Sequence, residues 1–131
     1  MKSYFLQTRL ETSVGIDGKI RTLLTPLSYY SVLLDEVITV PIGFETDFGS
    51  IPQMFQNILP KDGTSLFAYI IHDLLYQITY RNDRLLCDSV LKEAQECLGE
   101  SFYARNTVKL GLRIGGAKAW NEHKNKGLRN A

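Results

Sequence analysis

The chain carries almost no excess charge, and this absence argues against a nucleic acid bound through a basic surface. Its 15 basic and 14 acidic residues leave a formal net charge of +1. Domains that bind nucleic acid through a basic surface have a clear excess of lysine and arginine. The sequence therefore has no nucleic-acid signature.

Long apolar runs and a leader are also lacking. No stretch approaches the ~18 apolar residues that a membrane-spanning helix requires, and no basic segment followed by an apolar one opens the chain. We expect a soluble protein with no transmembrane segment and no secretory signal. The length of 131 residues suits a single domain over 1–131, since a chain of this size buries roughly two-thirds of its unfolded surface.

Cysteine is scarce, and the two cysteines cannot form a disulfide with each other. Cys87 and Cys97 stand ten residues apart in a predicted helix, which separates them by about 15 Å at 1.5 Å per residue. A disulfide requires Cα atoms within about 7 Å of each other. We expect two buried free thiols.

Several catalytic motifs are absent as well. The sequence has no G-x-S-x-G elbow, no P-loop, no H-E-x-x-H and no C-x-x-C. Of its two histidines, His123 stands beside lysines near the predicted end of the last helix, where we expect a solvated side chain. Any histidine chemistry therefore depends on His72.

The first third of the chain has the pattern of β-strands. Residues 3–12 alternate in the period of two that is typical of a half-buried strand. The Asp-Gly dipeptide at 17–18 favours a tight hairpin, so the chain should return antiparallel. Further strands are predicted over 29–34 and 37–40, and residues 1–43 are expected to be mostly β.

The period then changes to that of an α-helix. Apolar residues recur at helical spacing over 65–80 and again over 83–98, and Gly99 is a natural helix stop. A short helix is predicted near 52–59 and a last one over 102–123.

Together these patterns predict an α+β fold, an N-terminal antiparallel sheet followed by three or four helices. The helices of His72 and Asp88 should form an antiparallel pair. The expected parts are a β region (1–43), a motif loop (44–51), a helical region (52–123) and a frayed tail (124–131).

The helix predicted over 65–80 carries a polar stripe beside its apolar one. Three tyrosines on this face indicate a partly buried polar surface, because a solvated face more often carries lysine, glutamate and glutamine. Two interpretations stay open: the groups satisfy one another's hydrogen bonds, or they form part of a catalytic site. The stripe consists of Tyr69, His72, Asp73, Tyr76 and Tyr80.

The segment FETDFGSIP, residues 44–52, is a second candidate because it combines acids, a glycine and hydroxyls. The carboxylates of Asp47 and Asp73, with backbone carbonyls, could form the hard-oxygen site that Ca²⁺ or Mg²⁺ prefers, beside His72 as the base for a bound water. The alternative is a loop held by turns and caps, which Asp47 also suits. We expect Asp47, His72 and Asp73 to lie in one hydrogen-bonded cluster.

These motifs resemble a known family. The order F-x-T-D-F-x-S-I-P, then H-D-x-x-Y, then Arg81 or Arg84 with Asp88 is similar to a phage and bacterial domain-of-unknown-function family, number thirteen fifty-three. The resemblance runs from about Pro41 to Trp120. It implies a phage or prophage origin and little about activity.

A looser resemblance concerns mechanism. H-D-x-x-Y on a helix, with an upstream loop and a later aspartate, is similar to secreted and parvoviral phospholipases A2. The resemblance implies His72 as the base, Asp73 as a metal ligand, Asp88 as the residue that orients His72, and Tyr76 as its support. The chain lacks the cysteines that flank the motif in the secreted enzymes and their glycine-rich calcium loop.

The expected register of the two helices separates His72 from Asp88. If the chain reverses symmetrically around 80–83, His72 lies level with about Leu91, which leaves Asp88 ~4.5 Å away along the axis. Arg84, at i and i+4, is then the better partner for Asp88.

Two classes of function remain, and the sequence does not decide whether the protein is an enzyme. The first is a non-enzymatic phage protein, either a virion component or a factor that binds a host protein, whose partners are phage structural proteins or that host protein. The second is a metal-assisted hydrolase of a host-envelope ester or amide. Either is expected in the host cytoplasm during infection or in the virion.

Overall fold

The computed structural model describes residues 1–18, 20–46, 65–100 and 102–129. Within these ranges strands come first and helices follow, as predicted for an α+β fold. The strands are β1 (Tyr4–Phe5), β2 (Thr12–Val14), β3 (Arg21–Leu23), β4 (Leu27–Ser31), β5 (Glu36–Val40) and β6 (Glu45–Thr46). The helices are α2 (Ser65–Gln77), the 3₁₀ turn η1 (Tyr80–Asn82), α3 (Arg84–Cys97) and α4 (Phe102–Arg129).

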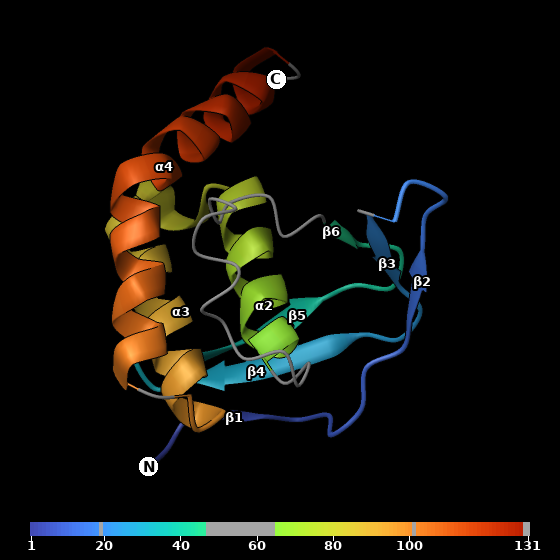
Figure 1. Cartoon of the computed structure of the whole chain (residues 1–131), viewed down its shortest axis with the longest axis vertical. Coiled ribbons are helices and arrows are strands. Elements are labelled where there is room, and N and C mark those ends of the chain that lie inside the picture. The colour runs from blue at the N-terminus through green and yellow to red at the C-terminus, as the bar shows by residue number, and fades with distance from the viewer. Residues whose placement is uncertain (19, 47–64, 101, 130–131) are drawn as a thin grey trace.

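The described strands form two antiparallel sheets of three strands, in the orders β1-β4-β5 and β2-β3-β6. Helix α2 packs on β5 and α3 packs on β4, while α4 contacts both helices. Figure 1 shows the β2-β3-β6 sheet at the side of the molecule away from α3 and α4. The helical layer therefore covers the β1-β4-β5 sheet.

The predicted hairpin is confirmed. Strands β2 and β3 pair with Thr12 opposite Leu23 and Val14 opposite Arg21. Gly18 in the connection has a φ of 71°, a conformation that glycine adopts without the steric cost of a side chain.

The single strand expected over 3–12 is wrong, because this stretch supplies strands to two sheets. β1 pairs with β4, and β2 pairs with β3. The Leu6 N–H still donates to the Ser28 carbonyl at 2.9 Å, but the Ser28 N–H donates to the side-chain oxygen of Gln7 at 2.6 Å. A side-chain acceptor thus replaces the backbone acceptor and ends the ladder.

Helices α2 and α3 begin close to their predicted positions. Asp83 caps α3 by accepting a hydrogen bond from the Leu86 N–H at 3.0 Å, as expected of an aspartate in this position. Gly99, with a φ of 78°, follows the end of α3.

The ends of two helices differ from the predictions. α2 stops at Gln77, before the predicted end at 80, and Ile78 beyond it is 55% exposed. α4 continues to Arg129, past the expected end at His123. The frayed tail expected over 124–131 stays a prediction. The short helix predicted near 52–59 lies outside the described residues.

The core lies between the β1-β4-β5 sheet and the helices. Its sheet side is mostly apolar but includes the hydroxyls of Tyr29 and Ser31, and its helical side comes from one face each of α2 and α3. The largest fully buried side chains include Leu23, Leu27, Tyr29, Val40, Ile70, Ile71, Leu75, Tyr76, Val90, Leu91 and Gln95.

One carboxylate ties α3 to the sheet. Glu93 accepts hydrogen bonds from the Tyr29 hydroxyl at 2.6 Å and the Ser31 hydroxyl at 2.7 Å, both on Oε1. Its Oε2 accepts from the Leu33 N–H at 2.8 Å. Because hydrogen bonds to an ionised acceptor are stronger than neutral ones, Glu93 fixes where α3 crosses β4.

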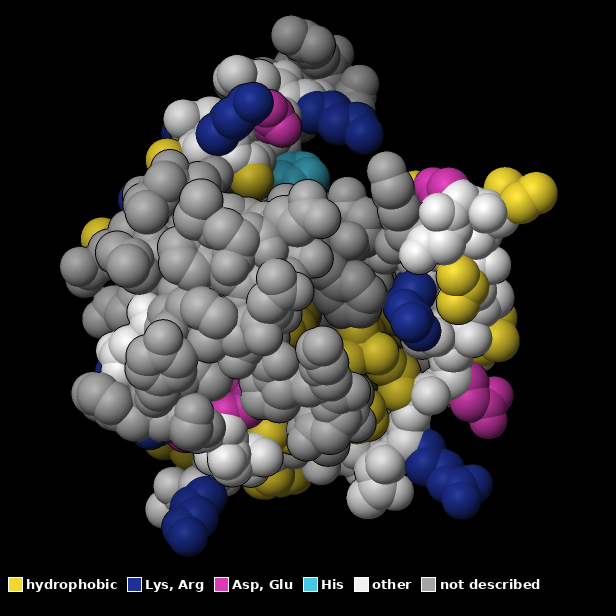
Figure 2. Space-filling view, viewed as in Figure 1, with side chains coloured by type: hydrophobic (Ala, Val, Ile, Leu, Met, Phe, Trp, Pro, Cys, Tyr) yellow, Lys and Arg dark blue, Asp and Glu magenta, His cyan; other side chains and the backbone are white. Residues whose placement is uncertain are grey.

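Several hydrophobic side chains are exposed on the surface of the β2-β3-β6 sheet. They lie around β2 and β3 (Figure 2), and among them are Val14, Ile16 and Leu24.

In the part of the chain that the structure describes, no helix combines the length and apolar character needed to cross a membrane.

Candidate functional site

The polar stripe of α2 faces the inside of the protein. Tyr69, His72, Asp73 and Tyr76 are each 9% exposed or less, and His72 is only 3% exposed. This confirms the prediction of a buried polar surface. Polar groups at such a depth are normally hydrogen-bonded, so their partners define the site.

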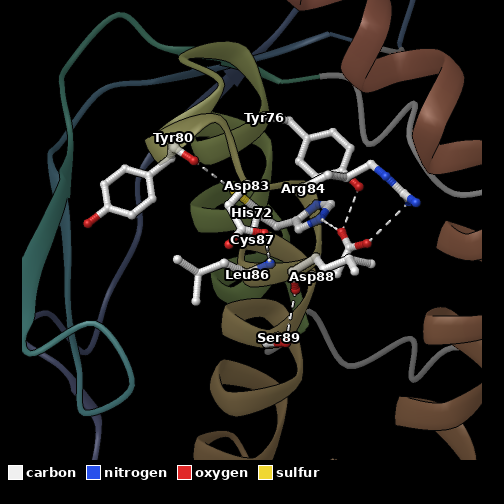
Figure 3. Close-up of polar contacts among 10 residues, drawn as sticks. His72, Tyr76, Tyr80, Asp83, Arg84, Leu86, Cys87, Asp88 and Ser89 are labelled. Carbon is white, nitrogen blue, oxygen red and sulfur yellow. Dashed lines mark hydrogen bonds and ion pairs between the residues drawn. The ribbon is translucent and has the colours of Figure 1, made fainter.

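His72 and Asp88 are in direct contact. The distance between His72 Nε2 and Asp88 Oδ1 is 2.9 Å, and the Tyr76 hydroxyl donates to the same oxygen at 2.6 Å. Arg84 Nη1 lies 3.6 Å from the other oxygen, Oδ2. Figure 3 shows the three side chains converging on the Asp88 carboxylate. We call these four residues the Asp88 network.

The hydrogen bonds of the Asp88 network assign the proton positions. Burial, and then the bond to Asp88, raise the pKa of Tyr76 well above its usual value, so the phenol keeps its proton and donates. Asp88 as a carboxylate can only accept. His72 Nε2 must therefore carry a proton, and in a neutral imidazole the free lone pair is then on Nδ1.

The contact between His72 and Asp88 corrects the expected register. The turn between α2 and α3 is not a symmetric reversal, because Thr79, Arg81 and Asn82 all have positive φ, at 44°, 50° and 51°. These left-handed residues tighten the connection and bring Asp88 level with His72. The predicted pairing of Arg84 with Asp88, at i and i+4, is confirmed.

Two side-chain contacts of Arg81, one of them outside the turn, hold this conformation. The Arg81 guanidinium lies 3.6 Å from the Glu36 carboxylate at the start of β5. It also lies over the ring of Tyr80, 5.1 Å from the centroid, at a distance typical of a cation–π contact. Left-handed conformations of non-glycine residues cost about 1–2 kcal/mol each, and such strain is concentrated at functional sites.

Aromatic rings cover the Asp88 network on one side. The Tyr76 ring lies 4.2 Å from that of His72, and the ring of Trp120 meets Tyr76 edge-on, with centroids 5.3 Å apart and planes at 80°. Trp120 comes from α4 and is 6% exposed. The sequence gave no signal that Trp120 touches the histidine site.

Of the two proposed metal ligands, only Asp73 lies within the described residues. Asp73 is described, 9% exposed and engaged in interactions within the fold, whereas Asp47 lies outside the described residues. Among the residues described, no cluster of three or more histidine, cysteine, aspartate or glutamate side chains could hold a metal ion. The cluster of Asp47, His72 and Asp73 therefore stays a prediction.

The segment before Asp47 begins next to α2. The Gln77 side-chain amide donates to the Glu45 carbonyl at 3.3 Å, which ties β6 to the C-terminal end of α2. Among the described residues, Thr46 is 2% exposed and its hydroxyl has no hydrogen-bond partner. The start of the motif loop thus lies beside the C-terminal end of the helix that carries His72.

The two cysteines have different environments. Cys87 is buried and free, and burial raises the pKa of its thiol to about 12. Cys97 is also free but exposed, which corrects the expectation of two buried thiols. Neither thiol is placed in the Asp88 network.

Comparison with known proteins gives one informative result. Residues 21–111 match the model of a family described as Protein of unknown function (DUF1353). This range contains His72, Tyr76, Arg84 and Asp88 but not Trp120. Searches of curated proteins and of solved structures found no match.

Proposed function

The chain belongs to the family of unknown function DUF1353; because that membership leaves the activity open, we propose from the geometry of the site that the chain is a hydrolase whose general base is His72. The substrate class is an ester or amide of the host envelope. Asp88 orients His72, and Tyr76 supports Asp88. A phage or prophage origin, as the first resemblance implies, fits such a substrate.

One observation carries this proposal: Nε2 of His72 and the hydroxyl of Tyr76 meet on the same oxygen of Asp88, at 2.9 and 2.6 Å. A carboxylate in this position fixes both the tautomer and the orientation of the imidazole, which is what a histidine base requires. The second donor stops the carboxylate from turning away. The expected register of the two helices was the strongest argument against this pairing.

The chemistry follows from the proton positions. Nδ1 of His72 takes a proton from a water molecule while the water oxygen attacks the carbonyl carbon. The resulting imidazolium is stabilised by Asp88 across the Nε2–H bond. It then returns the proton from Nδ1 to the leaving alkoxide or amine as the carbon–heteroatom bond breaks, so neutral imidazole is regenerated.

A hard cation fits the proposal through Asp73 and Asp47. Carboxylate oxygens are the ligands that Ca²⁺ and Mg²⁺ prefer, and Asp73 follows His72 directly on α2. Such an ion, when bound, supplies positive charge for the oxyanion that forms on the substrate carbonyl. The matching test is a Ca²⁺ titration in which the melting temperature is the readout. Ca²⁺ should raise the melting temperature of the wild type more than that of Asp73→Asn.

The activity test uses nitrophenyl esters and anilides of several chain lengths and vesicles of bacterial phospholipid, with Ca²⁺ or a chelator. His72→Asn should lower the rate at least ~100-fold, the lower end of what a general base supplies. His123→Asn is the matched control and should leave the rate unchanged. Wild-type turnover no faster than that of His72→Asn on every substrate overturns the proposal.

A second candidate function is favoured by the depth of the site. His72 is 3% exposed, and a histidine so enclosed also suits a purely structural network. The chain would then be a virion component or a factor that binds a host protein, with phage structural proteins or that host protein as partners, in the host cytoplasm or the virion.

The two candidates give opposite results for His72→Asn. A structural His72 loses hydrogen-bonded partners on substitution, and the variant should lose about 1–3 kcal/mol of unfolding free energy. Its phage phenotype should then recover at low temperature. If the variant is as stable as the wild type and its phenotype does not recover at low temperature, the structural role is excluded. Detection of the chain in purified phage particles supports a role as a virion component.

A further inference from the structure

The closed state of the site raises the question of how a substrate reaches it. His72 is 3% exposed, and Trp120 is 6% exposed. Trp120 packs edge-on against Tyr76, and Tyr76 packs against His72. The rings of Trp120 and Tyr76 thus lie in series between α4 and the proposed base. Access to His72 from this side requires Trp120 to move.

The part of α4 that carries Trp120 is poorly anchored. From 121 to 127 every residue is exposed except His123, which is half-buried. Trp120 and Ala119 are the contacts of this part with the hydrophobic core, as far as the structure describes it. In Figure 1 the C-terminal part of α4 leaves the body of the protein and points away from α3.

A weak point precedes Trp120 in the same helix. Gly115 and Gly116 stand side by side in the middle of α4, and glycine is the weakest helix former apart from proline. Sharp bends in helices occur at proline or at pairs of small residues such as glycine. α4 changes direction part-way along its length in Figure 1. The glycine pair is therefore the weakest point of α4 on the N-terminal side of its single buried tryptophan.

We propose that the segment of α4 after Gly115 and Gly116 is a lid, and that Trp120 is the plug that closes the His72 site. In the closed form the Trp120 ring covers Tyr76 and keeps water and substrate from His72. In the open form the segment swings on the glycine pair and uncovers the polar face of α2. The importance of the lid for turnover rests on the proposed hydrolase function, but the motion itself does not.

The chain is well suited to a direct test, because it has one tryptophan and two histidines. Diethyl pyrocarbonate acylates accessible imidazoles, and mass spectrometry separates the peptides of His72 and His123. Labelling of His72 in native Trp120→Ala should be at least about 10-fold faster than in the wild type, because labelling follows the population of the open form. His123 should label equally in both and serves as the internal control.

Two further variants keep the test decisive. Trp120→Phe retains an aromatic edge against Tyr76 and should label His72 within about 3-fold of the wild type, since the ring contact largely survives. Trp120→Leu fills much of the volume without the ring, and it replaces Trp120→Ala if that variant loses its circular dichroism. A folded Trp120→Ala or Trp120→Leu with wild-type labelling of His72 overturns the proposal.

The wild type supplies an independent measurement. Amides of residues 116–120, whose helical hydrogen bonds span the glycine pair, should exchange with deuterium much faster than those of α2 and α3, because a swing on this pair breaks these bonds without global unfolding. Equal protection along α4 and α3 contradicts the lid. If Trp120→Ala uncovers His72 while no variant hydrolyses any ester, the lid stands and the hydrolase proposal fails. Turnover that depends on His72, with labelling that does not depend on Trp120, supports the hydrolase and overturns the lid.

Discussion

His72 and Asp88 stand sixteen positions apart on consecutive helices, and their side chains meet at 2.9 Å on the oxygen that also accepts the Tyr76 hydroxyl. This relationship joins two motifs within the matched range into one network. It gives a buried imidazole a fixed tautomer, with Nδ1 as the atom that can accept a proton. Substitutions in the network and in the contacts that position it should therefore have distinct, measurable effects.

Tyr76→Phe should destabilise the protein by about 1.5–3 kcal/mol, because it removes a hydrogen bond to a charged acceptor at a buried site. Urea unfolding measures the change. Tyr30→Phe is the matched control, since the Tyr30 hydroxyl donates to Asp35 at 3.0 Å but on the exposed surface. Its effect should be much smaller, as is usual for a substitution on the surface. Equal effects of the two substitutions contradict the role given to Tyr76.

Glu93→Gln should cost about 2 kcal/mol or more of unfolding free energy. The substitution replaces one acceptor oxygen with an amide that donates, so at least one of the donors from Tyr29, Ser31 and Leu33 loses its partner. Glu96→Gln is the control, because the Glu96 carboxylate is 51% exposed in its ion pair with Arg105. Exposed pairs contribute about 0–1 kcal/mol, and a larger loss for Glu96→Gln than for Glu93→Gln refutes this assignment.

The stability should fall steeply in alkali. Burial raises the pKa of Tyr29, Tyr69 and Tyr76 above the ordinary value of 10.0. The unfolded chain therefore loses these protons at a pH at which the folded chain keeps them. Stability is unaffected below about pH 10 and decreases above it, by up to about 1.4 kcal/mol per pH unit for each such tyrosine.

Melting temperatures between about pH 8 and pH 11.5, measured for the wild type and Tyr76→Phe, check this prediction. The variant should show a shallower decline above about pH 10, because it has one tyrosine fewer that releases a proton on unfolding. Parallel curves for the two proteins contradict a strongly raised pKa at Tyr76.

Thr79→Gly should stabilise the protein by about 0.5–1 kcal/mol. Thr79 has a φ of 44° and a ψ of 56°, and a β-branched residue is strained in this left-handed conformation. Glycine removes a strain of about 1–2 kcal/mol against an entropic cost of about 0.5–1 kcal/mol. Thr79→Ala retains the Cβ and should bring no gain. A destabilised Thr79→Gly shows that the threonine side chain contributes more than the strain costs.

The helices and the hairpin could be predicted from sequence because their signals are local. The apolar stripe of α2, the Asp83 cap of α3, and the Asp-Gly turn at 17–18 each act within a few residues. The break between β1 and β2 could not be predicted, since it depends on Gln7 taking the N–H of Ser28, a residue twenty-one positions away.

The contact at the centre of the site was missed for a different physical reason. The register of α2 and α3 depends on Thr79, Arg81 and Asn82, three residues with positive φ and no glycine among them. No sequence signal indicates left-handed threonine or arginine, because the strain is compensated by distant contacts such as Arg81 with Glu36. The residue types of the network could be predicted, but their meeting depends on this turn.

The most direct test of whether Asp88 orients His72 as a base is the tautomer of His72 at neutral pH. Long-range proton–nitrogen correlation NMR measures it, and the His72→Asn variant identifies which signals belong to His72. We expect a proton on Nε2, held by Asp88, and an unprotonated Nδ1. A neutral ring with its proton on Nδ1 would mean that Nε2 accepts a hydrogen bond rather than donating one. That result contradicts a carboxylate-oriented base, whatever the activity of the protein.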